Sequence, residues 1–111
     1  MKDETAALIA LAENLRVDSE DLKEILSLFF STIPKQIEEM KVAIEREDFR
    51  ALHATSHTLK GTSANLLYDN ISKTAAEIEA MCLKKATKGY TPLFNKLNIQ
   101  SSNAKMKICY S

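Results

Sequence analysis

Apolar residues recur at helical spacing through much of the chain. Pro34 lies within the longest stripe and would remove a helical hydrogen bond, but the apolar spacing continues in phase across it. The sequence therefore predicts one long, kinked helix over about residues 19–46, with Asp18 as its N-cap. The inward positions, at alternating steps of three and four residues, are Leu22, Leu26, Phe29, Ile33, Ile37, Met40 and Ile44.

Two shorter stripes predict two further helices. The first begins near Asp48, and its two serines make the buried face unusually small, which favours the close approach of a neighbouring helix; its inward positions are Phe49, Leu52, Ser56, Leu59, Ser63 and Leu66. The second begins near Asn70, and Gly89 is expected to end it. Its inward positions are Ile71, Ala75, Ile78 and Cys82.

The two ends of the chain complete the predicted fold. Residues 4–15 are rich in Ala and Leu and predict a short capping helix. Thr91 is expected to cap a last helix, with Pro92 in its first turn and Leu93, Phe94 and Leu97 facing inward. Beyond Leu97 only Ala104 and Ile108 stay in phase, so we expect this half to be frayed or incompletely packed. The predicted fold is all-α: an antiparallel four-helix bundle with an additional N-terminal capping helix, forming a single domain over residues 1–111.

Composition and charge narrow the function classes. Fifteen basic residues balance fifteen acidic ones, so the net charge offers no general attraction to nucleic acid or to an anionic membrane. The chain shows no targeting segment and no apolar stretch of the roughly 20 residues that span a bilayer, which predicts a cytoplasmic protein. Cys82 and Cys109 are far apart and match no zinc spacing, and both are expected to be reduced.

The chemistry-bearing residues lie on the helix that begins near Asp48. His57 points about 130° away from the buried stripe, at roughly 100° per residue, and should face water. Gly61, one turn later, costs about 0.5–1 kcal/mol relative to alanine in a helix, so we expect it to clear space beside the imidazole. Lys60 can offer a cation to a phosphoryl oxygen. A neutral imidazole is a competent nucleophile, so these residues predict a phosphate acceptor.

The segment SHTLKGTSANL, which contains His57, Lys60 and Gly61, resembles the His-x-x-Lys-Gly signature of the histidine-containing phosphotransfer (HPt) family. The predicted order of helices is similar to that family over nearly the whole chain. The resemblance implies a phosphocarrier, not an enzyme, in a two-component multistep phosphorelay. His57 would accept phosphate from an aspartate of one receiver domain and pass it to an aspartate of another. Lys60 would stabilise the phosphate, and Gly61 would give access to His57.

The implied partners are receiver domains of response regulators, a sensor histidine kinase, or both. The protein itself needs no cofactor, because the receiver brings Mg²⁺, and the chain contains no GxxxxGK[ST] loop for ATP. We expect a monomer. The rim of the docking surface is expected to comprise Arg50, His53, Ala54 and Ala64. Family members often carry a glycine where this chain has Leu67, and leucine tolerates a left-handed turn poorly, so the turn around Leu67 is expected to be built differently.

Two alternatives stand beside the phosphocarrier. A bundle that only binds a receiver or kinase, and regulates it without carrying phosphate, would have the same fold. A metal site is the second alternative, because His53 and His57 are spaced i, i+4 on one helix. No carboxylate at a helical step clearly completes such a site, and a structural metal takes about four ligands, so no metal is expected.

Overall fold

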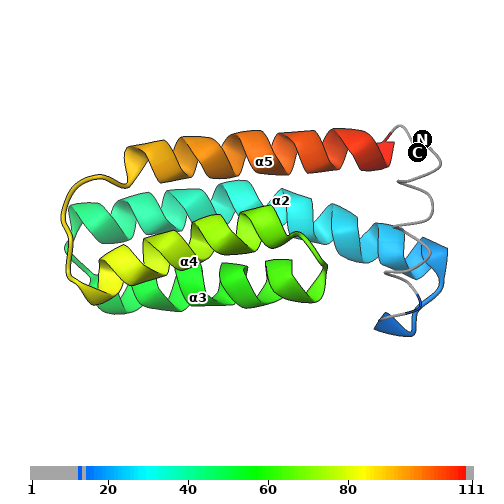
Figure 1. Cartoon of the computed structure of the whole chain (residues 1–111), viewed down its shortest axis with the longest axis horizontal. Helices are drawn as coiled ribbons and strands as arrows, with labels where there is room; N and C mark the ends of the chain where they lie inside the picture. The colour runs from blue at the N-terminus through cyan, green and yellow to red at the C-terminus, as the bar shows by residue number, and fades with distance from the viewer. Residues whose placement is uncertain (1–12, 14, 110–111) are drawn as a thin grey trace.

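The computed structural model describes residues 13 and 15–109, and this part of the chain forms helices without strands. The helices are α2 (Ser19–Glu45), α3 (Phe49–Asn65), α4 (Asp69–Leu83) and α5 (Thr91–Cys109). Consecutive helices run in opposite directions, and α2 and α5 also contact each other, which closes the bundle (Figure 1). The predicted all-helical fold is confirmed. The expected capping helix over residues 4–15 lies almost entirely outside the described residues.

Helix α2 is continuous across Pro34, as the uninterrupted apolar stripe predicted. The Asp18 carboxylate accepts a hydrogen bond of 2.8 Å from the backbone amide of Asp21, which is the expected N-cap. Pro34 is exposed, while Ile33 and Ile37 on either side of it are buried. The helix continues because the burial of this face offsets the loss of one backbone hydrogen bond.

The core follows the predicted stripes, except that Ile44 and Phe49 are only partly buried. In α3 the inward serines Ser56 and Ser63 are fully buried between leucines. Each donates its hydroxyl to a carbonyl of its own helix: Ser56 to His53 at 3.2 Å and Ser63 to Leu59 at 2.6 Å. These internal bonds let small polar side chains lie in an apolar interior without an unsatisfied donor.

Three helices end in the same way, each without glycine. Glu47, Leu67 and Lys85 follow the C-caps of α2, α3 and α4, and all three have left-handed backbones with φ of 51°, 65° and 55°. After α3, the Leu67 amide bonds to the Ala64 carbonyl at 3.0 Å and the Tyr68 amide to the Ser63 carbonyl at 2.8 Å. This pair of bonds is a Schellman motif. The turn at Leu67 is therefore the ordinary helix ending of this protein, and the prediction that it would be built differently is wrong.

Two other predicted boundaries also need correction. Helix α4 ends at Leu83, well before Gly89, because Lys85 takes the left-handed position that glycine was expected to supply. Helix α5 begins one residue earlier than expected: Thr91 is itself helical, and the carbonyl of Tyr90 accepts from the amides of Leu93 and Phe94. The role of N-cap predicted for Thr91 therefore falls to Tyr90.

The second half of α5 is helical to Cys109, so it is not frayed. Its packing is incomplete, as the weak pattern indicated: Ile99 and Met106 are more than half exposed, and Ala104 is only partly buried against the core. Among the residues described, no helix combines the length and apolarity that crossing a membrane requires.

Candidate functional site

His57 lies near the middle of α3, on the side of the helix that faces away from Leu52 and Leu59. Its side chain is 63% exposed, whereas those two leucines have no exposed surface. The outward orientation predicted for His57 is therefore what the structure shows. The rest of the helix packs against α2 and α4, which fixes the direction in which the imidazole projects.

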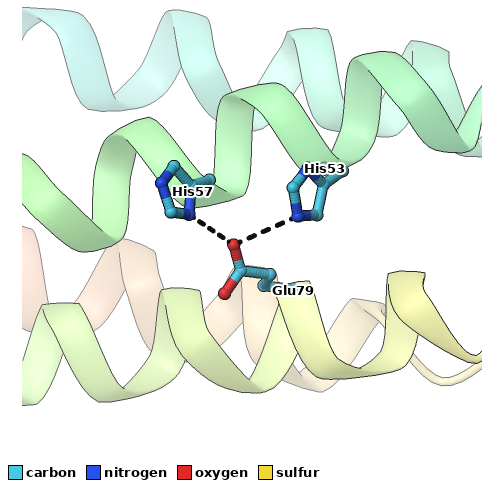
Figure 2. Close-up of side chains that lie close together, drawn as sticks. All are labelled: His53, His57 and Glu79. Carbon is cyan, nitrogen blue, oxygen red and sulfur yellow. Dashed lines mark hydrogen bonds and ion pairs between the residues drawn. The ribbon is translucent and has the colours of Figure 1, made fainter.

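The imidazole of His57 meets a carboxylate from the neighbouring helix (Figure 2). Glu79 of α4 is almost fully buried, and its Oε2 atom lies 2.7 Å from Nδ1 of His57. The other carboxylate oxygen, Oε1, accepts a hydrogen bond of 2.6 Å from the Lys60 ammonium. Glu79 thus joins two residues of the His-x-x-Lys-Gly segment through one carboxylate.

The environment keeps this carboxylate ionised. The hydrogen bond from Lys60 lowers the pKa of Glu79 below its ordinary value, and the bond with His57 lowers it further. Burial acts in the opposite direction but does not outweigh these bonds. An ionised carboxylate can only accept hydrogen bonds, so Nδ1 of His57 must carry the hydrogen that it shares with Glu79. The unprotonated nitrogen of a neutral His57 is then Nε2, on the far side of the ring.

His53 completes a compact group that we call the Glu79 cluster: His53, His57, Lys60 and Glu79. Nε2 of His53 lies 3.4 Å from the same Oε2 atom that contacts His57. The two imidazole rings are nearly parallel, with centroids 5.7 Å apart and an angle of 16° between them (Figure 2). His53 was expected at the rim of the docking surface, but in the structure it lies next to the carboxylate that contacts His57.

The remaining candidate residues lie outside the cluster. Gly61 is exposed, and, apart from its own helix, no described atom lies within 4 Å of the place a Cβ would take. Arg50, Ala54 and Ala64 are exposed on α3. Because Gly61 and two of these three neighbours have short side chains or none, the surface beside His57 is low and open.

Glu79 was not among the residues predicted for the site. Spacing along α3 does not reveal it, because Glu79 belongs to α4. The sequence does contain an indication of this residue. Glu79 lies between Ile78 and Cys82, which were predicted to face inward, so its carboxylate is expected at the edge of a buried stripe. A charged residue in such a position usually has a partner, and here α3 supplies three.

The site is thus an exposed histidine on a helical bundle, held from behind by a buried carboxylate. In a comparison with known families, the Hpt domain family matches residues 24–100. The chain belongs to this family, whose members are phosphotransfer modules of phosphorelays and not catalytic enzymes. No curated protein shows significant similarity to the chain.

A solved structure supports the same fold. The HPT domain from an Hpt sensor hybrid histidine kinase of Shewanella superimposes with a TM-score of 0.70 and 18% sequence identity. The match covers 94% of this chain and 93% of the other. At this identity the similarity concerns the fold.

Proposed function

We propose that this protein carries a phosphoryl group on His57 between aspartates of receiver domains in a multistep phosphorelay. The observation that carries the proposal is the hydrogen bond between Nδ1 of His57 and the ionised Glu79. It orients an otherwise exposed imidazole and leaves Nε2 free to act as the nucleophile.

The proposed reaction follows from that arrangement. Nε2 of His57 attacks the phosphorus of an aspartyl phosphate, an N–P bond forms, and the P–O bond to the aspartate breaks, which returns a free carboxylate to the receiver. The imidazole gains positive charge during attack, and Glu79 stabilises that charge through the Nδ1 hydrogen. The reverse reaction delivers the phosphoryl group to the aspartate of a second receiver.

Lys60 and Gly61 have supporting roles in this proposal. In the resting site the Lys60 ammonium lies on Glu79, one turn from His57, where it can turn toward a phosphoryl oxygen without leaving the cluster. The open surface at Gly61 admits the receiver. We further propose that the receiver supplies Mg²⁺, that this protein needs no cofactor and has no kinase activity, and that it acts as a single-domain monomer in the cytoplasm.

The test is transfer of label from a phosphorylated receiver domain to the full chain. We expect acid-labile label on the wild type and none on His57→Gln. The matched control is Lys41→Gln, which removes an exposed lysine of α2 and leaves the Glu79 cluster intact. If several receivers bind the wild type but leave no label on it, the protein is a binding-only regulator and the phosphocarrier proposal is wrong.

A further inference from the structure

We propose that His53, His57 and Glu79 form a Zn²⁺ site that competes with the phosphoryl group for His57. The competition rests on the proposed function, whereas the metal site does not. The sequence alone did not predict a metal site, because only two possible ligands, His53 and His57, were evident from the spacing. The structure supplies the third: one atom from each of the three residues, all within 4.8 Å of one another, drawn from two helices (Figure 2).

The distances suit a small four-coordinate ion. Zinc bonds of about 2.0–2.2 Å in a tetrahedron place the ligand atoms roughly 3.3–3.6 Å apart. Oε2 of Glu79 is already 3.4 Å from Nε2 of His53. Its 2.7 Å contact with Nδ1 of His57 is shorter because a hydrogen bond spans it, and a metal would replace that hydrogen. To bind zinc this contact must widen to about 3.3 Å, and the ligand nitrogens of His53 and His57, which lie within 4.8 Å of each other, must reach a similar separation.

The surroundings of the three ligands also favour an ion. Lys60 holds the other oxygen of Glu79, so Oε2 stays turned toward both imidazoles, as outer partners of metal ligands commonly arrange. The side chains of His53 and His57 are 44% and 63% exposed, which leaves an entry path and room for water as a fourth ligand. Two imidazoles and one carboxylate suit Zn²⁺, whereas Mg²⁺ prefers oxygen ligands.

Zinc at this position would prevent His57 from accepting phosphate. A metal ion occupies the lone pair of Nδ1, so the hydrogen of the neutral ring moves to Nε2. Nε2 then has no free electron pair for attack on phosphorus. Metal binding and phosphoryl transfer therefore need opposite tautomers of one side chain, and the metal would switch the site off reversibly.

The first experiment measures binding alone, by calorimetric titration of Zn²⁺ into the full chain. We expect one equivalent to bind, and affinity to fall at least about 10-fold in His53→Gln and in Glu79→Gln. The matched control is Glu77→Gln, which removes an exposed carboxylate from the same helix and should not change affinity. Mg²⁺ should give no binding heat. Equal zinc affinity in the wild type, His53→Gln and Glu79→Gln would place the ion elsewhere and overturn the proposal.

The second experiment separates this inference from the proposed function. We expect Zn²⁺ to block label transfer to the wild type, with recovery after a chelator is added. Each protein is compared with itself, and the ratio of label transfer with zinc to transfer without zinc should stay near one for His53→Gln, whatever the rate of that variant without zinc. Because both proteins use the same receiver, any effect of zinc on the receiver cancels. Label transfer without zinc binding would overturn only the metal site. Zinc binding to a chain that never accepts label would overturn only the phosphocarrier.

Discussion

The two faces of α3 use small residues for opposite purposes. On the inner face Ser63 has no exposed surface and returns its hydroxyl to Leu59 of its own helix. On the outer face Gly61 borders open space and lies one turn from the exposed His57. A small side chain therefore serves packing on one face and access on the other. The comparison predicts that inner substitutions mainly change the free energy of unfolding, whereas outer substitutions mainly change the rate of phosphoryl transfer and affect stability less.

The largest effect expected is on the inner face. Leu59→Ala removes a fully buried side chain and should lower the free energy of unfolding by about 2–5 kcal/mol. Transfer of phosphate per folded molecule should stay at the wild-type level. Urea unfolding followed by circular dichroism measures the first quantity, and label transfer at low temperature measures the second. A loss of transfer in the fully folded variant would show that the two faces are not independent.

The second prediction concerns the carboxylate behind the outer face. Glu79→Gln keeps an acceptor near His57 but removes its charge, so the rate of label transfer should fall about 10-fold, which corresponds to about 1.4 kcal/mol. Glu77→Gln, on the same helix, should transfer at the wild-type rate. Equal rates in the two variants would mean that Glu79 has only a structural role.

The pH dependence of stability follows from the same carboxylate. The pKa of Glu79 is lowered in the folded protein, so its contribution is complete above the ordinary value of 4.5 and is lost as the pH falls through the lowered one. The difference in unfolding free energy between wild type and Glu79→Gln, about 1 kcal/mol near pH 5, should therefore shrink toward pH 3. Denaturant titrations of both proteins across this range measure it, and a difference that does not change with pH would contradict the argument.

The smallest effect is expected for Gly61→Ala, which should increase stability but slow phosphoryl transfer. Gly61→Ala should raise the free energy of unfolding by about 0.5–1 kcal/mol, because alanine favours the helix and meets open space. The added methyl group should slow transfer from the receiver without changing the exposure of His57. Unfolding and transfer rates of the one variant test both statements, and an unchanged transfer rate would remove access as the reason for Gly61.

The fold could be predicted largely because burial repeats along the chain. The stripe across Pro34 correctly indicated one continuous helix, since its apolar positions stay in phase on both sides. The ends of the helices were less predictable. Left-handed backbone conformations occur at Glu47, Leu67 and Lys85, although glycine is the residue that adopts them most easily. The conformation costs a residue other than glycine about 1–2 kcal/mol, and the packing of the bundle offsets that cost.

The candidate site could be predicted only in part, for a geometric reason. His57, Lys60 and Gly61 lie on one helix, so their relative directions follow from the helical repeat. The position of Glu79 depends on how α4 is rotated about its own axis beside α3, and no spacing within either helix contains that rotation. The contact between His57 and Glu79 spans 22 residues, through the turn at Leu67.

That turn has a consequence for comparing sequences. Because a residue inserted between the turn at Leu67 and Glu79 would swing the carboxylate by about 100° around α4, the contact tolerates no change in length along that stretch. An alignment that places a gap between the start of α4 and position 79 would therefore pair the histidine with the wrong acidic neighbour. A fixed interval of 22 residues from the histidine to a carboxylate, added to His-x-x-Lys-Gly, defines a four-residue search pattern for proteins with this same site.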